Sequence, residues 1–395
     1  MKRLPLQPWM RDEAVASVMA ALGEARFVGG AVRDTLVGRP VADIDIATPL
    51  TPDQTMAALT AAGLKYAPTG VEHGTVTAIS GGRGFEVTTL RRDVETDGRR
   101  AVVAFTPDWA EDAQRRDFRL NALYLDAEGN LYDPVGGGIE DALAGRVIFV
   151  GDARTRIRED YLRALRFFRF WAWYGRGEPD ADAVAAITDL KDGIAGLSGE
   201  RVSKELLKLL AAPEPRPAVA LAYRTGVLAV ALPEATEFQR FDEGMVDIDP
   251  DPLLRLASLL PSLEDGLRVA ERLRLSNAQR ERLRAVLAEG EPLEVDLNAA
   301  ALRRRLYAWG AAAYIDRVKM AWAADGDERW ADLLKAAEDY VRPVLPVGGA
   351  DAKMAGLAPG PGMGQALKAV EAWWIEQDFK PGRAEVLEKL RALAG

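Results

Sequence analysis

Hydrophobic and polar positions follow two different patterns along the chain, and the change falls near residue 150. Before it, short apolar runs alternate between the period of two expected of strands and the 3.6-residue period of helices. Strands are predicted at 25–28, 43–47, 75–79, 84–90 and 122–126, and helices at 15–22, 31–37 and 52–62. After it, strand patterns vanish. The sequence therefore predicts an α+β fold, with a small mixed-sheet head followed by an all-helical remainder.

The helical remainder is divided by proline and glycine. Helical spacing is predicted at 155–174, 199–210, 216–222, 252–260, 277–287, 299–307, 325–340 and 364–377. Breaks are predicted at 213–217 and 247–252, and the Gly/Pro-rich stretch 348–364 sets off the last segment. One run in the head, 91–101, is charged and almost without apolar residues, and we predict a mobile loop there.

The most informative segment is GGAVRDTLVGRPVADIDI, residues 29–46. If 42–47 forms a strand, Asp43 and Asp45 share one face while Ile44 and Ile46 point into the core. Two carboxylates held so close favour a divalent cation between them, and oxygen ligands suit Mg²⁺. The glycine pair Gly29 and Gly30 precedes the predicted helix 31–37, whose free N–H groups could receive a triphosphate. The alternatives are a surface Asp-x-Asp and an ordinary glycine turn.

A third carboxylate, Glu86, stands on the predicted strand 84–90, with Phe85 and Val87 on the opposite face. Three carboxylates on neighbouring strands are what two-metal phosphoryl transfer needs. A solvated glutamate on a strand face is the competing interpretation.

The segment EDYLRALRFFRF, residues 159–170, is the second strong signal. On a continuous helix Glu159, Arg163, Arg166 and Phe170 line one stripe, and Asp160 lies next to Arg163. A carboxylate can accept from the exocyclic amine of cytosine or adenine, and an adjacent arginine can donate to a ring nitrogen or carbonyl of the same base. An amphipathic helix with surface ion pairs is the alternative.

Composition excludes several kinds of covalent link, metal site and catalytic domain. The 395 residues include no cysteine and one histidine, His73, which excludes disulfides, cysteine–zinc sites and paired-histidine phosphohydrolase domains. No run reaches the ~18–20 apolar residues that span a bilayer, and the first ten residues do not resemble a signal peptide. The absence of cysteine leads us to expect a cytoplasmic protein. The net charge of −9 argues mildly against nucleic acid, although arginines cluster locally.

Five motifs in order, GGAVRDTLVGRPVADIDI, FEVTTLRRDVETDGRR, RRDFRLNALYLD, DPVGG and EDYLRALRFFRF, resemble class II CCA-adding enzymes (tRNA nucleotidyltransferases) and the related bacterial poly(A) polymerases. The resemblance is dense over 27–210. It implies a nucleotidyltransferase-type head at 1–148, a helical neck at 149–210, a helical body at 211–345 and a helical tail at 346–395 that contacts tRNA.

The resemblance also implies roles for single residues. It places Mg²⁺ on Asp43 and Asp45, with Glu86 completing the catalytic carboxylates. It makes Asp160 and Arg163 the readers of the incoming base, without a nucleic acid template. The further nucleotide-binding positions are Gly30, Arg33, Arg116, Arg166 and Arg169, to which the glycine-turn argument adds Gly29.

The resemblance implies addition of C, C and A to tRNA 3′ ends from CTP and ATP, with release of pyrophosphate. The family's flexible loop falls on 91–101, and its presence favours complete CCA addition. An A-adding enzyme, a poly(A) polymerase and a catalytically silent tRNA-binding protein are the alternatives. The tail segment 356–364 is either a backbone phosphate site for tRNA or a plain turn, and His73 is expected in a turn or in packing rather than in catalysis.

Overall fold

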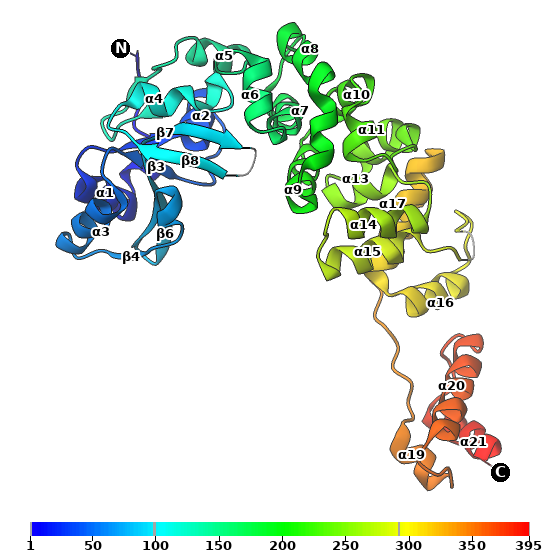
Figure 1. Cartoon of the computed structure of the whole chain (residues 1–395). Helices are drawn as coiled ribbons and strands as arrows, with labels where there is room; N and C mark the ends of the chain where they lie inside the picture. The colour runs from blue at the N-terminus through cyan, green and yellow to red at the C-terminus, as the bar shows by residue number, and fades with distance from the viewer. Residues whose placement is uncertain (1, 98–99, 291–292, 395) are drawn as a thin grey trace. The chain divides into compact units, whose positions relative to one another are not determined.

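A computed structural model describes residues 2–97, 100–290 and 293–394 of the chain. The contacts within it divide the chain into two compact units, Met1–Ala235 and Thr236–Gly395. Figure 1 shows the strands confined to the first part of the chain and the helices that follow them. The predicted α+β fold, a mixed-sheet head followed by helices, is confirmed. The division into head, neck, body and tail stays a prediction.

The head is built on one mixed sheet with the strand order β1-β10-β9-β2-β3-β6-β5-β4. Its strands are β1 (Lys2–Arg3), β2 (Arg26–Val28), β3 (Asp45–Thr48), β4 (Lys65–Ala67), β5 (Thr75–Ser80), β6 (Arg83–Thr89), β9 (Tyr124–Leu125) and β10 (Asn130–Tyr132). Among these strands only β3 and β6 pair in parallel. This pair aligns Asp45 with Glu86, and it therefore sets the geometry of the candidate site.

Alternating burial explains the two faces of the sheet. On β5 and β6 the side chains of Val76, Ala78, Phe85 and Val87 are buried, while Glu86 between the last two is exposed. The helices α1 (Glu13–Leu22) and α3 (Pro52–Ala61) pack against β5. One face of the sheet is thus a core, and the carboxylates lie on the other.

The charged run 91–101 is not the loop that the sequence predicts. It lies in an antiparallel hairpin of β7 (Arg91–Asp97) and β8 (Arg100–Phe105), with residues 98–99 outside the described part of the chain (Figure 1). A two-stranded ribbon satisfies its backbone groups by pairing, so the charged run RRDVETD can form a strand against the more apolar RAVVAF. The Asp-Gly pair at 97–98 is a strong hairpin signal in the sequence.

The predicted helix 155–174 is in fact two helices, α6 (Ala153–Glu159) and α7 (Leu162–Tyr174). The chain leaves helical geometry at Asp160, whose φ and ψ are −157° and 106°, and the Asp160 carboxylate accepts the N–H of Leu162 at 3.1 Å. Aspartate competes with helical hydrogen bonds in this way, and it therefore favours a helix boundary.

The other helices of the first unit are α2 (Gly30–Val37), α4 (Trp109–Gln114), α5 (Gly138–Ala144), α8 (Ala181–Leu190), α9 (Gly199–Leu210), α10 (Arg216–Arg224) and α11 (Val227–Ala231). A 3-10 turn, Arg119–Asn121, lies against α5.

The regular elements among the described residues of the second unit are all helices. Its helices are α12 (Val246–Ile248), α13 (Pro252–Ser258), α14 (Leu263–Arg272), α15 (Asn277–Leu287), α16 (Ala299–Trp309), α17 (Ala311–Asp325), α18 (Trp330–Glu338), α19 (Gly349–Met354), α20 (Pro361–Glu376) and α21 (Arg383–Ala394). The predicted helix 325–340 begins too early, because Asp325 ends α17 and Gly326 follows in left-handed geometry at a φ of 71°. No helix among the described residues has both the length and the apolar character to cross a bilayer.

Gly138, the first residue of α5, allows a close contact in the head. A Cβ there would lie 2.5 Å from the carbonyl oxygen of Arg119 and 3.1 Å from Leu123 Cδ2. We predict that Gly138→Ala destabilises the protein by about 1–3 kcal/mol, because the backbone oxygen has to shift. Gly364→Ala, in open space within α20, is the control and should be neutral or slightly stabilising. Thermal unfolding measures both, and equal melting temperatures would contradict the prediction.

Candidate active site

Two of the three predicted carboxylates lie side by side. Asp45 is the first residue of β3, and it is paired in register with Glu86 on β6. Both side chains are exposed, whereas their neighbours Ile46 and Val87 are buried. The strand alternation that the sequence predicts is therefore correct for Asp45.

Asp43 differs from the prediction, because β3 begins only at Asp45. Asp43 stands in the segment that leads into the strand, and strand alternation does not orient it. It nevertheless lies close enough to act electrostatically on Asp45 and lines the same cavity.

The pKa of Asp45 lies above the ordinary value for an aspartate. Partial desolvation by the surrounding protein is the largest cause, followed by repulsion from Glu86 and from Asp43, and Arg116 opposes them. Repulsion of this kind is relieved when a cation binds between the carboxylates.

The residues present fit a divalent cation. Asp43, Asp45 and Glu86 make no ion pair with a lysine or arginine in the part of the chain that the structure describes. Their oxygens are free acceptors of the hard type that Mg²⁺ and similar ions prefer. Within 2–97, 100–290 and 293–394 no three acidic or histidine side chains stand already gathered around a cation position.

A cavity with a volume of about 320 Å³ is lined by Asp43 and Asp45, whereas Glu86 is not among its lining residues. Its lining includes nine residues of the head: Gly29, Gly30, Arg33, Asp34, Asp43, Asp45, Arg116, Asp117 and Asn121. It also includes three residues of α7: Arg166, Arg169 and Phe170. The lining thus combines the unpaired carboxylates of Asp43 and Asp45 with four arginines, as a site for a metal-bound polyphosphate requires.

The glycine pair is placed as predicted. Gly30 begins α2, and Gly29 caps it with a φ of 65°, a left-handed conformation that favours glycine. The first N–H groups of a helix have no partner within it, so this end of α2 offers donors beside the arginines.

Arg33 is almost fully buried, and its guanidinium makes four hydrogen bonds. Two go to the Asp34 carboxylate at 3.0 and 3.1 Å, one to Asn121 Oδ1 at 2.6 Å and one to the Tyr174 hydroxyl at 2.6 Å. The predicted nucleotide-binding position is therefore held rigidly from both the head and α7.

Arg116 is held by Asp112 and Tyr124. Its guanidinium donates to the Asp112 carboxylate at 2.9 Å and to the Tyr124 hydroxyl at 3.2 Å. Burial alone would lower the pKa of Arg116, but Tyr124 and Asp112 raise it, so the positive charge is secure. Burial would raise the pKa of Asp112, and Arg116 and Arg115 hold it well below its ordinary range.

Two carboxylates fix the arginines of α7. Asp117 accepts from Arg166 Nε at 2.7 Å and from Asn121 Nδ2 at 3.1 Å. Burial would raise the pKa of Asp117, but Arg166 and these hydrogen bonds lower it. Glu205 on α9 accepts from Arg169 Nε at 2.5 Å. Both arginines, predicted from the resemblance, are thus brought to the cavity with their orientation set.

Asp160 and Arg163, the predicted readers of the base, are not among the residues that line this cavity. Asp160 is paired with Arg201 of α9 at 2.6 Å, and Arg163 is paired with Glu159. Arg163 also donates to the carbonyl oxygen of Arg115 at 3.1 Å, which places it beside the motif that carries Arg116.

Sequence reasoning missed the partners that orient the arginines: Asp34, Asp112, Asp117, Asn121, Tyr174 and Glu205. A signal was available for Glu205, which lies three residues after Val202 and four before Leu209 on the buried side of α9, whereas Asp117 in RRDFRL carries no such signal. His73 lies in a short 3-10 turn with its side chain 74% exposed, which agrees with the predicted turn.

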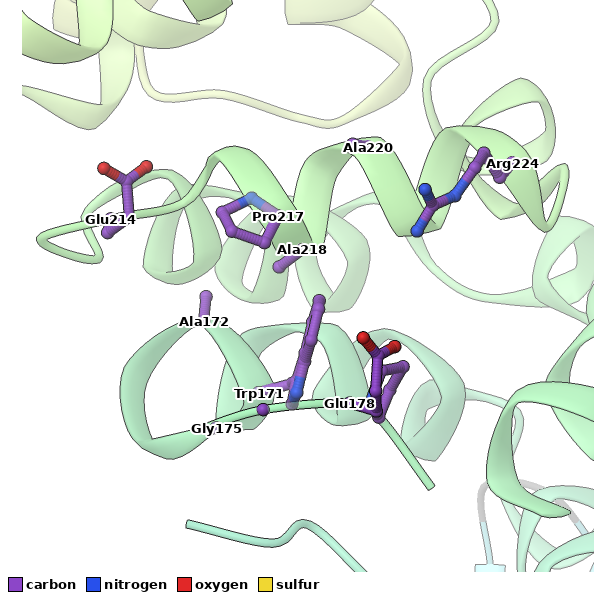
Figure 2. A pocket seen from close by; sticks show the side chains of 11 residues that line it. Trp171, Ala172, Gly175, Glu178, Glu214, Pro217, Ala218, Ala220 and Arg224 are labelled. Atoms are coloured by element: carbon purple, nitrogen blue, oxygen red, sulfur yellow. The ribbon is translucent and has the colours of Figure 1, made fainter. Parts of the chain in front are cut away.

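A second, larger cavity of about 470 Å³ lies between α7, the segment after it and α10. Figure 2 shows Trp171 and Glu178 on one side of it, and Pro217 and Arg224, both on α10, on the other. Its lining has neither paired carboxylates nor a group of arginines. We therefore place the chemistry in the smaller cavity.

Two protein families match parts of the chain. Residues 25–148 match the family described as Poly A polymerase head domain, and residues 178–239 match one described as Probable RNA and SrmB-binding site of polymerase A. The first range contains the three carboxylates, and the second contains most of the larger cavity's lining.

Individual proteins match over more of the chain. The mitochondrial CCA tRNA nucleotidyltransferase 1 of Mus musculus is 34% identical over 93% of this chain and 86% of its own. The CCA-adding enzyme of Geobacillus sp. (strain WCH70) is 42% identical over 56% of this chain and 54% of its own. The crystal structure of the Bacillus stearothermophilus CCA-adding enzyme in complex with CTP superposes with a TM-score of 0.81 at 27% identity, covering 98% of this chain and 99% of that one.

The motif resemblance, the opposed carboxylates and arginines, and the similarity to the mouse protein over most of both chains agree with one another. The chain belongs to the family of CCA tRNA nucleotidyltransferases.

Proposed function

We propose that this chain adds C, C and A in turn to the 3′ ends of tRNA, using CTP and ATP and releasing pyrophosphate. The observation that carries the proposal is the parallel pairing of Asp45 with Glu86, together with the presence of Asp43, Asp45 and four arginines around one cavity. Relatives named CCA-adding enzymes support the choice of reaction, and a related structure titled as a CTP complex supports the choice of substrate.

Membership of this nucleotidyltransferase family implies a divalent metal ion. We propose that the ion is Mg²⁺ and that Asp43 and Asp45 hold it, with Glu86 assisting. When bound, such an ion lowers the pKa of an attacking hydroxyl and offsets charge on the phosphates.

Arginine side chains and backbone N–H groups of this chain bind and orient the triphosphate. Arg33 and Arg116, with the free N–H groups at the start of α2, offset the charge of the triphosphate. The 3′-hydroxyl of the tRNA then attacks the α-phosphate in line, and pyrophosphate leaves. No side chain is needed as a covalent nucleophile.

Asp160 and Arg163 are proposed to select the base. Their present partners, Arg201 and Glu159, would have to yield to the base edge when a nucleotide binds. The carboxylate accepts from the exocyclic amine of cytosine or adenine, and uracil and guanine present a carbonyl there instead.

Addition of A alone and poly(A) synthesis remain the second candidates. The hairpin β7–β8 stands where the resemblance puts the flexible loop of complete CCA-adding enzymes, and this favours CCA addition. We also propose a cytoplasmic location, on the absence of cysteine, although the mouse and human relatives are named mitochondrial.

The reaction is tested with labelled CTP and ATP, given separately and together to tRNA transcripts that end before CCA, after C and after CC. We expect two C additions and one A, and nothing from UTP or GTP. Addition of A alone to the CC-ended transcript would identify an A-adding enzyme. Long A tracts on any RNA would identify a poly(A) polymerase, and absence of any addition would contradict the proposal.

Asp45→Asn should lower the turnover rate without lowering the stability of the metal-free protein. We expect loss of at least about 10³-fold in turnover, since several kcal/mol of metal-dependent stabilisation are removed. Because the folded pKa of Asp45 is raised, the ionised carboxylate destabilises the metal-free protein, and stability falls as the pH rises from the ordinary aspartate pKa through the raised one.

Above that window, Asp45→Asn should therefore melt at a higher temperature than the native protein when both are kept in chelator. Adding Mg²⁺ should raise the melting temperature of the native protein and not of the variant. Asp53→Asn, an exposed position on α3, is the control for loss of a carboxylate. Normal turnover by Asp45→Asn would refute the metal assignment.

Arg163→Ala should relax the choice of base. We expect incorporation of UTP and GTP relative to CTP to rise by about tenfold or more, as expected for the loss of one good base-edge contact. Arg158→Ala, an exposed arginine of α6, is the matched control and should leave the ratio unchanged. The ratio of nucleotides, rather than the rate, is the measurement, and an unchanged ratio would assign base selection elsewhere.

A further inference from the structure

The end of α7 contacts the head at Arg33, one of the residues that line the candidate nucleotide cavity. Tyr174, the last residue of α7, accepts a hydrogen bond from Arg33 Nη2 at 2.6 Å, and its hydroxyl is hydrogen-bonded to Asp34. The guanidinium of Arg33 lies 4.0 Å from the centre of the Tyr174 ring, and that of Arg39 lies 4.6 Å from it. One side chain of α7 thus contacts both members of the Arg33–Asp34 pair in the head.

A backbone contact beside it holds the same two parts together. The N–H of Arg176 donates to the carbonyl oxygen of Gly145 at 2.9 Å. Gly145 has a φ of 73°, and a Cβ there would lie 2.8 Å from the carbonyl oxygen of Tyr174. This close approach needs glycine, so the position of Tyr174 against the head is tightly restricted.

The Arg33 side chain is restricted by hydrogen bonds and by burial. Its four hydrogen bonds use four of the five N–H groups of a guanidinium, and its side chain is 8% exposed. Tyr174 supplies the only one of these bonds that comes from α7. Loss of its hydroxyl would leave Asp34 and Asn121 to orient the guanidinium from the head alone.

We propose that Tyr174 is a positioning residue for nucleotide binding, which fixes Arg33 from α7 and so couples the end of that helix to the triphosphate part of the cavity. This inference rests on the proposed function of the cavity. It assigns Tyr174 no part in reading the base or in the chemical step, because its contacts go to Arg33 and Asp34 and not to the carboxylates of β3 and β6.

The decisive variant is Tyr174→Phe, which keeps the ring against Arg33 and removes only the hydroxyl. We expect the KM for CTP and the KM for ATP to rise together by about tenfold, the size expected for a hydrogen bond to a charged group. We expect kcat at saturating nucleotide to stay within about twofold, and the melting temperature to fall only slightly because Asp34 and Asn121 still pair with Arg33. Tyr66→Phe, on the edge strand β4, is the control.

A double-variant cycle tests whether Tyr174 acts through Arg33. Arg33→Lys keeps the charge and removes the planar fork, so adding Tyr174→Phe to it should raise KM no further. Equilibrium binding of CTP to the full chain gives the same comparison without turnover. If the native protein binds CTP but adds nothing to tRNA, the proposed function fails while the positioning role is still measured.

Three results would overturn the inference. The first is a native KM for both nucleotides in Tyr174→Phe. The second is a change confined to one nucleotide or to kcat. The third is a melting temperature that falls with KM unchanged, which would make the contact structural only.

Discussion

Buried arginine charge is the constraint on which the site depends. Four arginines line a cavity of modest size, and each is held by an acidic or hydroxyl partner that is itself largely buried. A buried charge without a partner is strongly destabilising, so these pairs are a condition for folding as well as for binding. The same pairs stop the guanidinium groups from swinging toward the carboxylates of β3 and β6, and they leave those carboxylates free for a cation.

The site therefore has two kinds of charged group, arginines that have acidic or hydroxyl partners and carboxylates that have no basic partner. The arginines are neutralised by their own partners, whereas Asp43, Asp45 and Glu86 repel one another. Such local strain is typical of sites whose ligand completes the structure. A cation held by these carboxylates would add the positive charge that an anionic ligand needs here, so the net charge of −9 does not by itself decide what the cavity binds.

The sequence predicted those features whose signal is local. The helices at 199–210 and 277–287 have the predicted bounds because their apolar spacing and their ends are both clear. The strand at 91–97 was missed because its sequence, RRDVETD, shows no alternation of apolar and polar residues. The break at Asp160 was missed because the apolar spacing continues across it. The partners of the arginines could not be predicted, since Glu205 is separated from Arg169 by 36 residues and only the folded chain brings them together.

The parallel pair β3–β6 restricts how this protein can change in evolution. A strand that slips by one residue turns every side chain to the opposite face, so a single insertion within β6 would bury Glu86 and expose Val87. The chain between the two strands passes through α3, β4 and β5 and carries none of the residues that line the cavity. Insertions and deletions among homologues should therefore be found mainly in that crossover. The two strands themselves should tolerate substitution far better than insertion or deletion.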